Sequence, residues 1–186
     1  MGKLIYSLNV SLDGYAATPD GGLDWVIVDD ELHTWFNDRA GTIQASLYGR
    51  RMYELMADYW PTGEDDPSAT EAMREFERIW KPMPKVVFSS SLDHVEHNGR
   101  LVRGDVGTVL EELRRDFDGD LDIAGPNLAR QFARRGLVDE YQLVVHPVVL
   151  GAGISFWPEV DEPLRLQLVD RRAFESGAEL WSYVPS

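Results

Sequence analysis

The chain alternates short apolar runs with stretches of helical periodicity, and this alternation restricts the fold more than any other feature. Apolar runs that predict strands lie at residues 3–10, 43–48, 85–88, 121–124 and 141–145. Between these runs, apolar residues recur at steps of three and four, which is typical of helices that bury one face. Repeated strand–helix units predict an α/β fold with a mostly parallel sheet and helices on both faces.

Residues that cap or stop helices mark the boundaries of the predicted helices. Helices are expected over about 30–40, from Arg50, from Ser68, after Asp105, and from Gly125-Pro126-Asn127 through Arg135. Gly41 and Gly136 are expected to end the first and last of these helices, because glycine commonly follows the final helical turn. Ser68 and Glu71 fit a capping box, and Asp105 can accept hydrogen bonds from a free helix end.

Two further runs, 164–169 and 179–184, flank a short loop near the C-terminal end. They predict an antiparallel hairpin, so the sheet is expected to be mixed rather than wholly parallel. No internal repeat, low-complexity stretch or linker divides the 186 residues. We therefore expect one domain over residues 1–186, which agrees with the usual size of a domain.

Charge and composition exclude several classes of function. Acidic residues outnumber basic ones by 32 to 18, which gives a formal net charge of −14. This argues against nucleic acid or an anionic membrane as partner, because Lys and Arg contacts to phosphate dominate such binding. The chain has no cysteine, which excludes thiol catalysis and thiolate metal sites. No apolar run approaches the roughly 18 residues of a membrane span, and no signal peptide is recognisable, so we expect a cytoplasmic protein.

Three predicted strand ends carry residues suited to binding phosphate. Ligands of open α/β sheets bind at the carboxyl ends of the strands. At Gly49-Arg50-Arg51, free backbone N–H groups, a helix dipole and guanidinium groups would meet an anion. Ser89-Ser90 offers hydroxyl groups, and Gly125 allows close approach to the backbone. Each also has a plain structural explanation: solvated arginines, serines that end a strand, and a proline at a helix start.

Other candidate sites, namely nucleotide-binding motifs, metal ligands and catalytic acids, have little support in the remaining sequence. The glycine-rich dinucleotide motif and the Walker phosphate loop are absent. His94 and His97 have a spacing that converges on a metal only in a helix, and they lie in a polar, irregular stretch, so no metal site is predicted. Asp30 stands close in sequence to Trp25 and Phe36, aromatic residues that could hold a planar ligand.

Six short motifs occur in a fixed order along the chain: Ser11-Leu12-Asp13-Gly14-Tyr15, Asp24-Trp25, Gly49-Arg50-Arg51-x-Tyr53-Glu54, Val87-Phe88-Ser89-Ser90-x-Leu92, Gly136-Leu137-Val138-Asp139-Glu140-Tyr141 and Pro147-Val148-Val149-Leu150-Gly151-x-Gly153. Together they resemble the dihydrofolate-reductase-like proteins. The likeness is greatest to stand-alone relatives of the reductase domain of the bacterial bifunctional riboflavin-biosynthesis deaminase–reductase, and it covers nearly the whole chain. The resemblance implies a three-layer α/β/α fold around a mixed sheet. It also implies NADPH as hydride donor and a small planar substrate, pterin-like or pyrimidine-like.

The resemblance also implies which residues bind the cofactor. Its phosphates would lie among Gly49, Arg50, Arg51, Ser89, Ser90, Gly125, Pro126, Asn127 and Leu128. The arginines and serines would favour NADPH over NADH. Met52 stands where the family turn normally carries Thr, which removes one hydroxyl contact. The third turn of dihydrofolate reductases contains a cis Gly–Gly bond. Because a cis bond before proline costs only about 0.5–1 kcal/mol, we predict that Gly125–Pro126 is cis.

On the substrate side, the family carries an acidic residue on the helix after the tryptophan loop. Asp30 is the nearest match, and Asp29 and Glu31 remain alternatives. A carboxyl group in an apolar pocket has a raised pKa and can pass on a proton. By the same resemblance, Asn9, Asp13, Trp25 and Phe36 are expected to contact the substrate.

Three functional hypotheses follow. The leading one is an NADPH-dependent reductase. The second is a nucleotide-binding or interaction module that kept the fold and lost turnover, as Met52 and the open choice of acid would allow. The third is a metal hydrolase built on His94 and His97. Because related proteins often form homodimers, the C-terminal strands and Trp157 could also supply an interface.

Overall fold

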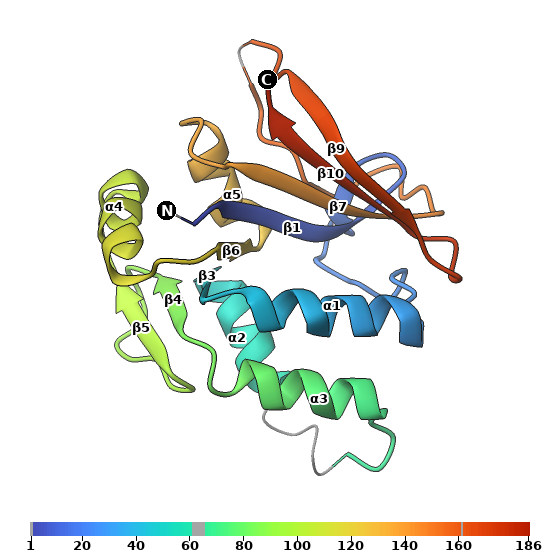
Figure 1. The fold of residues 1–186 in the computed structure, drawn as a ribbon, viewed down its shortest axis with the longest axis horizontal. Coiled ribbons are helices and arrows are strands. Elements are labelled where there is room, and N and C mark those ends of the chain that lie inside the picture. The colour runs from blue at the N-terminus through green and yellow to red at the C-terminus, as the bar shows by residue number, and fades with distance from the viewer. Residues whose placement is uncertain (1, 61–65, 161) are drawn as a thin grey trace.

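The computed structural model describes residues 2–60, 66–160 and 162–186, and its centre is an eight-stranded sheet (Figure 1). The order across the sheet is β5-β4-β3-β6-β1-β7-β10-β9. The strands are β1 (Leu4–Ser11), β3 (Ala45–Gly49), β4 (Lys85–Phe88), β5 (Gly99–Val102), β6 (Leu121–Ala124), β7 (Glu140–His146), β9 (Leu166–Ala173) and β10 (Glu179–Pro185). The first six are parallel, and β10 pairs antiparallel with both β7 and β9. The predicted mixed sheet with a C-terminal antiparallel pair is confirmed.

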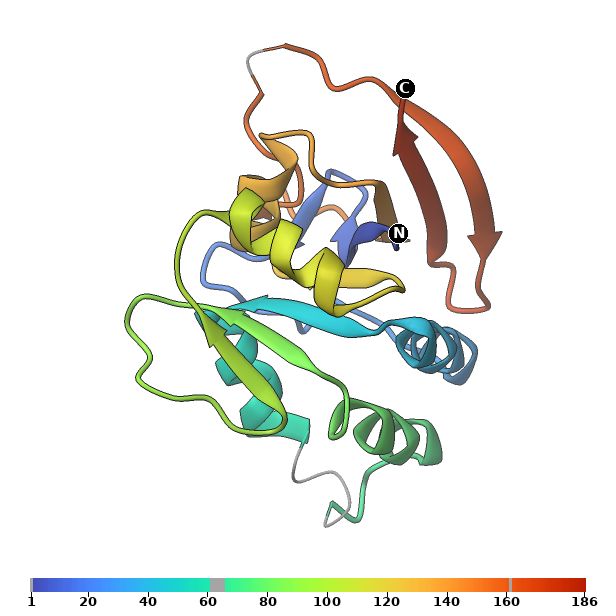
Figure 2. The ribbon, with the colours of Figure 1, turned by 60° about the vertical axis from the view of Figure 1, so that its left-hand side comes forward.

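Helices cover both faces of this sheet, as the strand–helix alternation predicts (Figure 2). They are α1 (Asp30–Thr42), α2 (Arg50–Tyr59), α3 (Glu71–Trp80), α4 (Val106–Asp116) and α5 (Pro126–Ala133). On one face, α4 and α5 bury their apolar residues against the sheet in a single large cluster. On the other face, Leu32 of α1 packs on Val144, and Tyr53 of α2 packs on Tyr48. Helix α3 lies beside α1, on the side of α1 that faces away from the sheet (Figure 1).

Three predicted helix boundaries are wrong, and one of them is the end of α5, which stops at Ala133 rather than at Arg135. Helix α1 does not end at Gly41 but continues to Thr42. Helix α3 is capped by Thr70, whose hydroxyl accepts a hydrogen bond from the Met73 N–H at 3.3 Å. Ser68 is unavailable as the cap because its hydroxyl donates to Asp66 at 2.7 Å. Both are hydroxyl residues close before the helix, so local sequence does not decide between them.

The prediction of a cis peptide bond at Gly125–Pro126 is also wrong, because none of the described peptide bonds is cis. Gly125 itself makes the sharp turn into α5, with φ 107° and ψ 127°. Only glycine adopts such angles readily, since a Cβ would collide with the backbone. Pro126 then occupies the first turn of α5, where its missing N–H leaves no helical hydrogen bond unmade.

One short strand of the main sheet and one small pair of strands were not predicted. Strand β5 contains Gly99 and Arg100 beside only two apolar residues, so its sequence lacks a clear strand pattern. Strands β2 (Tyr15–Ala17) and β8 (Ile154–Ser155) form a separate antiparallel pair.

Within the described ranges, no helix is long and apolar enough to cross a membrane.

A buried lysine holds α3 against the edge of the sheet. Lys85 of β4 is 1% exposed, and its ammonium group donates to the carbonyl oxygens of Trp80 at 2.5 Å, Met83 at 2.9 Å and His97 at 2.8 Å. The same group lies 3.9 Å from the centre of the Trp80 ring. Burial lowers the pKa of Lys85 to about 8, so the side chain is still mostly charged at neutral pH. It therefore supplies hydrogen bonds to carbonyl groups at the end of α3, where no helical N–H is available.

Candidate functional site

The three turns predicted to bind phosphate lie side by side at one edge of the sheet. They follow β3, β4 and β6, which are parallel neighbours and therefore end at the same edge. The strand register places Gly49 beside Phe88 and Tyr48 beside Ala124. Segments from three distant parts of the chain are thus brought together, as the parallel sheet requires.

Two helices begin at this edge without a side-chain cap. Gly49 precedes α2 and Gly125 precedes α5, and neither helix has an acidic residue in its first turn. By contrast, Asp29, Thr70 and Asp105 cap α1, α3 and α4. The first N–H groups of α2 and α5 therefore have no side-chain acceptor, and the positive ends of both helix dipoles remain unopposed.

The starts of these two helices also pack closely against each other. A Cβ on Gly49 would lie 3.7 Å from the Cβ of Leu128, and one on Gly125 would lie 3.4 Å from the Cβ of Met52. Glycine at both positions keeps the two backbones close enough for one ligand to reach both. A pair of helix N-termini at this spacing is suited to a pyrophosphate group.

Both arginines of the first turn are exposed. Arg50 makes only a loose contact with Glu54, with Nε 3.8 Å from Oε1, and Arg51 makes no ion pair with a described residue. In α5, Asn127 is exposed, whereas Leu128 is buried in the main core. Leu128 can therefore offer a ligand only its backbone N–H.

The two serines of the second turn differ in their surroundings. The Ser89 hydroxyl accepts hydrogen bonds from the N–H groups of Ser91 at 3.2 Å and Leu92 at 3.1 Å, so it shapes the turn. Ser90 is exposed, and no hydrogen bond involves its hydroxyl within the described residues. Of the two, Ser90 has the hydroxyl that is free to meet a ligand.

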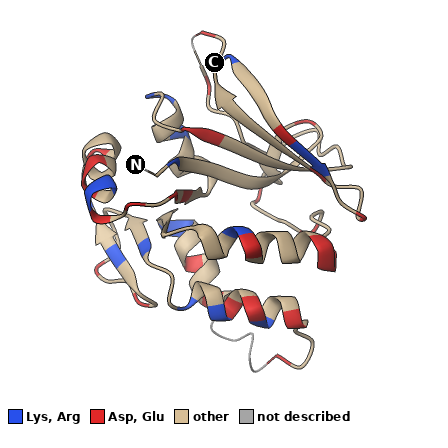
Figure 3. Ribbon diagram, viewed as in Figure 1, with Lys and Arg blue, Asp and Glu red and all other residues tan. Residues whose placement is uncertain are grey.

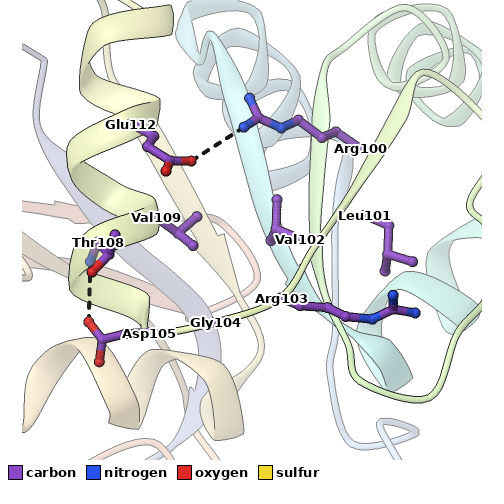
Figure 4. Close-up of a pocket in the computed structure, with 9 residues that line it drawn as sticks. All are labelled: Arg100, Leu101, Val102, Arg103, Gly104, Asp105, Thr108, Val109 and Glu112. Carbon is purple, nitrogen blue, oxygen red and sulfur yellow. Dashed lines mark hydrogen bonds and ion pairs between the residues drawn. The ribbon is translucent and has the colours of Figure 1, made fainter.

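Arg103 is a further basic residue at this edge that was not predicted. Its guanidinium group donates to the carbonyl oxygen of Leu92 at 2.7 Å, so it lies against the serine turn. It lines a hollow of about 320 Å³ between the end of β5 and the start of α4, and Figure 4 shows its side chain directed away from α4. A basic residue after a strand end is the pattern seen at Arg50, but β5 was not recognised as a strand.

On the side of the sheet edge where the family resemblance leads us to expect a substrate, the ends of β1 and β7 bring Asn9 and His146 together. The Oδ1 atom of Asn9 lies 2.8 Å from Nε2 of His146, and the Trp25 ring meets the imidazole edge-on at 5.6 Å between centres. His146 is 2% exposed, and burial lowers its pKa, so the ring is neutral at physiological pH. Its Nδ1 atom is buried without a hydrogen-bond partner among the described residues.

The sequence did not single out His146 as a site residue. Its partner Asn9 lies 137 positions away, and the pairing arises only because β1 and β7 are adjacent. The one available signal was its position, since His146 ends an apolar strand in the same way as the other residues of the site.

The three candidate acids have different roles in the structure. Asp29 caps α1, accepting hydrogen bonds from the N–H groups of Leu32 at 2.7 Å and Ser176 at 2.6 Å, which lower its pKa. Glu31 is held by Arg172 at 2.8 Å, and this contact lowers the pKa of Glu31. Asp30 is exposed on the first turn of α1 and is not enclosed in the apolar pocket that was expected, and its carboxylate makes no hydrogen bond within the described residues. Asp30 is therefore the acid of the three that remains free to act on a ligand.

Two other predicted substrate residues have structural contacts. The Asp13 carboxylate accepts hydrogen bonds from the Ser11 hydroxyl at 2.6 Å and the Gly151 N–H at 2.7 Å, which joins two loops. Phe36 is half-buried beside Trp35 and packs on the cluster around Leu32. Neither arrangement tests whether these residues also touch a substrate, so that stays a prediction.

The histidine pair considered as a metal site gains no third ligand. In the part of the chain that the structure describes, no group of three or more His, Asp or Glu side chains gathers to hold a metal ion. His94 is exposed, and His97 packs on the Trp80 ring at 5.6 Å between centres.

The fold and the turns at the sheet edge define an α/β domain of the dihydrofolate-reductase type. The chain belongs to the RibD C-terminal domain family, whose sequence profile it matches over residues 2–180. It is 31% identical over 179 residues to YyaP, an uncharacterized protein of Bacillus subtilis (strain 168), covering 94% of this chain and 90% of that one. The resemblance proposed from the sequence motifs is thereby confirmed.

Solved structures confirm the fold. A candidate riboflavin biosynthesis protein from Shewanella sp. PV-4 superposes with a TM-score of 0.79 at 21% identity, covering 99% of each chain. The diaminohydroxyphosphoribosylaminopyrimidine deaminase/5-amino-6-(5-phosphoribosylamino)uracil reductase of Thermotoga maritima gives 0.68 at 18% identity, covering all of this chain and 57% of that one. Enterococcus faecalis dihydrofolate reductase, complexed with NADP(H), gives 0.65 at 15% identity, covering 100% and 97%.

Proposed function

We propose that the protein is an NADPH-dependent reductase that transfers a hydride to a small, planar, heterocyclic substrate, pterin-like or pyrimidine-like. One observation carries the proposal: two uncapped helix starts lie together at the carboxyl edge of the sheet, next to two exposed arginines. In an otherwise acidic chain, this is where a dinucleotide's phosphates would find both N–H donors and positive charge.

The residues present fit a phosphorylated dinucleotide. The N–H groups at the starts of α2 and α5 would hold the pyrophosphate, and Gly49 and Gly125 allow its approach. Arg50, Arg51 and the Ser90 hydroxyl would bind the 2′-phosphate, with Arg103 close to the same turn. NADPH supplies the hydride when bound, and the protein's task is to orient the donor and the acceptor.

The substrate side offers groups that orient a ring and can act on it. Asn9 presents a neutral amide that His146 fixes in position, and the Trp25 ring packs edge-on against the imidazole. Asp30 stands at the start of α1 with a free, exposed carboxylate that would act on the substrate as a general acid–base group. Solved structures of the same fold support the proposed reductase function, since they include a uracil reductase and an NADP(H) complex.

Titration with NADPH and NADH, followed by nicotinamide fluorescence, tests the cofactor assignment. Replacing both arginines (Arg50→Gln with Arg51→Gln) removes two charge-assisted contacts to phosphate. Each such contact is worth about 1.5–3 kcal/mol when formed, and partial exposure reduces this. We expect NADPH affinity to fall at least tenfold, with NADH affinity little changed. Arg115→Gln, which removes an exposed arginine of α4, serves as the matched control. Absence of NADPH binding to the wild type would refute the proposal.

A second function is a nucleotide-binding module without turnover. Met52 favours it, because a thioether side chain lies against Gly125 where the family turn normally carries a hydroxyl. The engagement of Asp29 and Glu31 in structural contacts also leaves only Asp30 as the free acid. Binding of NADPH without its oxidation by any pterin or pyrimidine would favour this function over reduction.

A further inference from the structure

The two chain segments that build the substrate side contain no cation. Residues 4–38 include seven acidic residues and no Lys or Arg, and residues 136–164 also lack Lys and Arg. These segments supply β1, β7 and the loops 12–14, 23–29 and 147–151, which we call the substrate-side loops. Loops 12–14 and 23–29 contain acidic residues and loop 147–151 contains no charged residue, and Figure 3 shows the charged positions along the whole ribbon. The basic residues of the cofactor side all come from other parts of the chain.

Hydrogen bonds and a ring contact hold the substrate-side loops together at the ends of β1 and β7. The Leu12 N–H donates to the Val148 carbonyl at 2.8 Å, and Asp13 accepts from the Gly151 N–H at 2.7 Å. Trp25 of the second loop lies on His146, the last residue of β7. A substrate held beside Asn9 would therefore face all three loops.

These loops expose apolar side chains to an unusual degree. Five of the ten exposed large apolar residues in the described chain lie on them, with relative exposures of 42–67%: Leu12, Leu23, Ile27, Val28 and Val149. Scattered exposed apolar residues need no explanation, but a cluster of them around one site marks a surface that binds an apolar partner or ligand.

Three arginines of neighbouring elements are held in ion pairs. Arg172 of β9 reaches the start of α1, where Glu31 binds it at 2.8 Å. Arg171 is bound by Glu179 at 2.8 Å, and Arg39 of α1 is bound by Asp122 at 2.5 Å. On the same side, Asp24 and Asp30 are exposed carboxylates without a basic partner among the described residues. An anionic group would meet like charge here rather than a counter-ion.

We propose that the substrate of this reductase is a phosphate-free heterocycle with an apolar outer surface, recognised through the neutral Asn9–His146 pair and the apolar substrate-side loops. The inference rests on the proposed reductase function and specifies its substrate class. It separates this chain from the Thermotoga maritima relative, whose name specifies a phosphoribosylamino uracil. Like-charge contacts across a binding site exclude wrong ligands effectively, so the missing cations act as a specificity determinant.

Matched pairs of probes that differ only in phosphate test the proposal. One pair is 6-hydroxymethyl-7,8-dihydropterin and its diphosphate, and the other is 5-amino-6-(5-phosphoribosylamino)uracil and the nucleoside obtained from it with a phosphatase. Binding to the NADPH-saturated protein is measured by calorimetry, and turnover by loss of NADPH absorbance. We expect the phosphate-free member of at least one pair to bind at least tenfold more tightly, with a ratio that shrinks as salt screens the repulsion.

A charge introduced at the loops gives a gain-of-function test. Val149→Lys places a cation on a side chain that is 67% exposed, so it should improve binding of the phosphorylated probe several-fold relative to its phosphate-free partner. Val160→Lys is the matched control, because Val160 is 49% exposed but lies outside the substrate-side loops. It should change neither affinity.

Three results would overturn the proposal. These are equal or tighter binding of the phosphorylated probes by the wild type, the same response to Val149→Lys and Val160→Lys, and no binding of any probe at about 1 mM, which corresponds to only about −4 kcal/mol. Because NADPH binding is measured separately, each of these outcomes is distinguishable from failure of the cofactor assignment.

Discussion

Replacing Gly125 by alanine should damage both stability and cofactor binding, because this glycine makes the turn into α5. At φ 107° and ψ 127°, an L-residue is strained whatever its size, and such backbone strain costs about 1–3 kcal/mol. The new Cβ would also lie 3.4 Å from the Cβ of Met52 in a buried position. We therefore expect Gly125→Ala to lower the free energy of unfolding by about 2–3 kcal/mol.

Gly136 offers a matched control just beyond the other end of α5. It has φ 64°, in the left-handed helical region, and a Cβ there would have no heavy atom within 4 Å. Gly136→Ala should cost about 1 kcal/mol, from backbone strain alone. For a chain of this length, each kcal/mol lowers the melting temperature by about 2–4 °C, so the two variants should differ clearly in thermal unfolding followed by circular dichroism.

Cofactor binding separates the two positions further. Gly125→Ala should weaken NADPH at least tenfold, because relief of the strain moves the first N–H groups of α5 away from those of α2, whereas Gly136→Ala should leave NADPH affinity unchanged. If the variant folds poorly, adding Met52→Ala removes the Cγ and Cε atoms that would lie 3.7 Å from the new Cβ and should restore part of the stability, although the Cβ contact at 3.4 Å remains. Equal effects of both glycine substitutions on melting and on NADPH affinity would refute the reasoning.

Three further predictions concern single side chains. Lys85→Met should lower the free energy of unfolding in urea by about 2–3 kcal/mol, because two buried carbonyl groups and one partly buried one lose their donor; a loss below about 0.5 kcal/mol would contradict this. Hydrogen bonds lower the pKa of Asp13, so its contribution to stability is complete above the ordinary Asp pKa of about 3.9 and disappears as the pH falls through the lower folded value. In the Asp13→Ala variant, the free energy of unfolding should therefore fall less steeply as the pH is lowered into the acidic range. Burial lowers the pKa of His146 and His33, so stability should fall as the pH drops below about 6.5, where only the unfolded chain takes up the protons. His146→Gln and His33→Gln should each remove part of this fall, measured by urea unfolding at a series of pH values.

Local patterns predicted those parts of the site that are themselves local. The turns at Gly49 and Gly125 are each a strand, a glycine and a helix start within a few residues, so sequence identified them, and the parallel sheet then placed them together. The same reasoning failed where two local signals compete, as at Ser68 and Thr70, whose difference depends on the contact between Ser68 and Asp66. The general fold followed from the alternation of strand and helix alone.

Long-range pairings were out of reach of the sequence. The role of His146 depends on its contacts with Asn9 and Trp25, which are distant in the chain and lie beside it only because β1 and β7 pair. Arg103 was hidden for a related reason, since β5 is recognisable as a strand only through its pairing with β4. Residues whose role depends on a neighbour far away in sequence therefore require the sheet order before they can be assigned.

The two sides of the site differ in charge, and this difference has a consequence for the order of binding. The cofactor side contains Arg50, Arg51 and Arg103, whereas the segments of the substrate side contain acidic residues but no Lys or Arg. A bound dinucleotide phosphate would neutralise the arginines, so their positive charge would no longer be available to a second anion. An anionic substrate would therefore bind less tightly after NADPH than before it, whereas the affinity of a neutral substrate would not depend on this charge interaction. Measuring the affinity of each probe with and without NADPH tests this directly, and tighter binding of a phosphorylated probe in the presence of NADPH would contradict the charge argument.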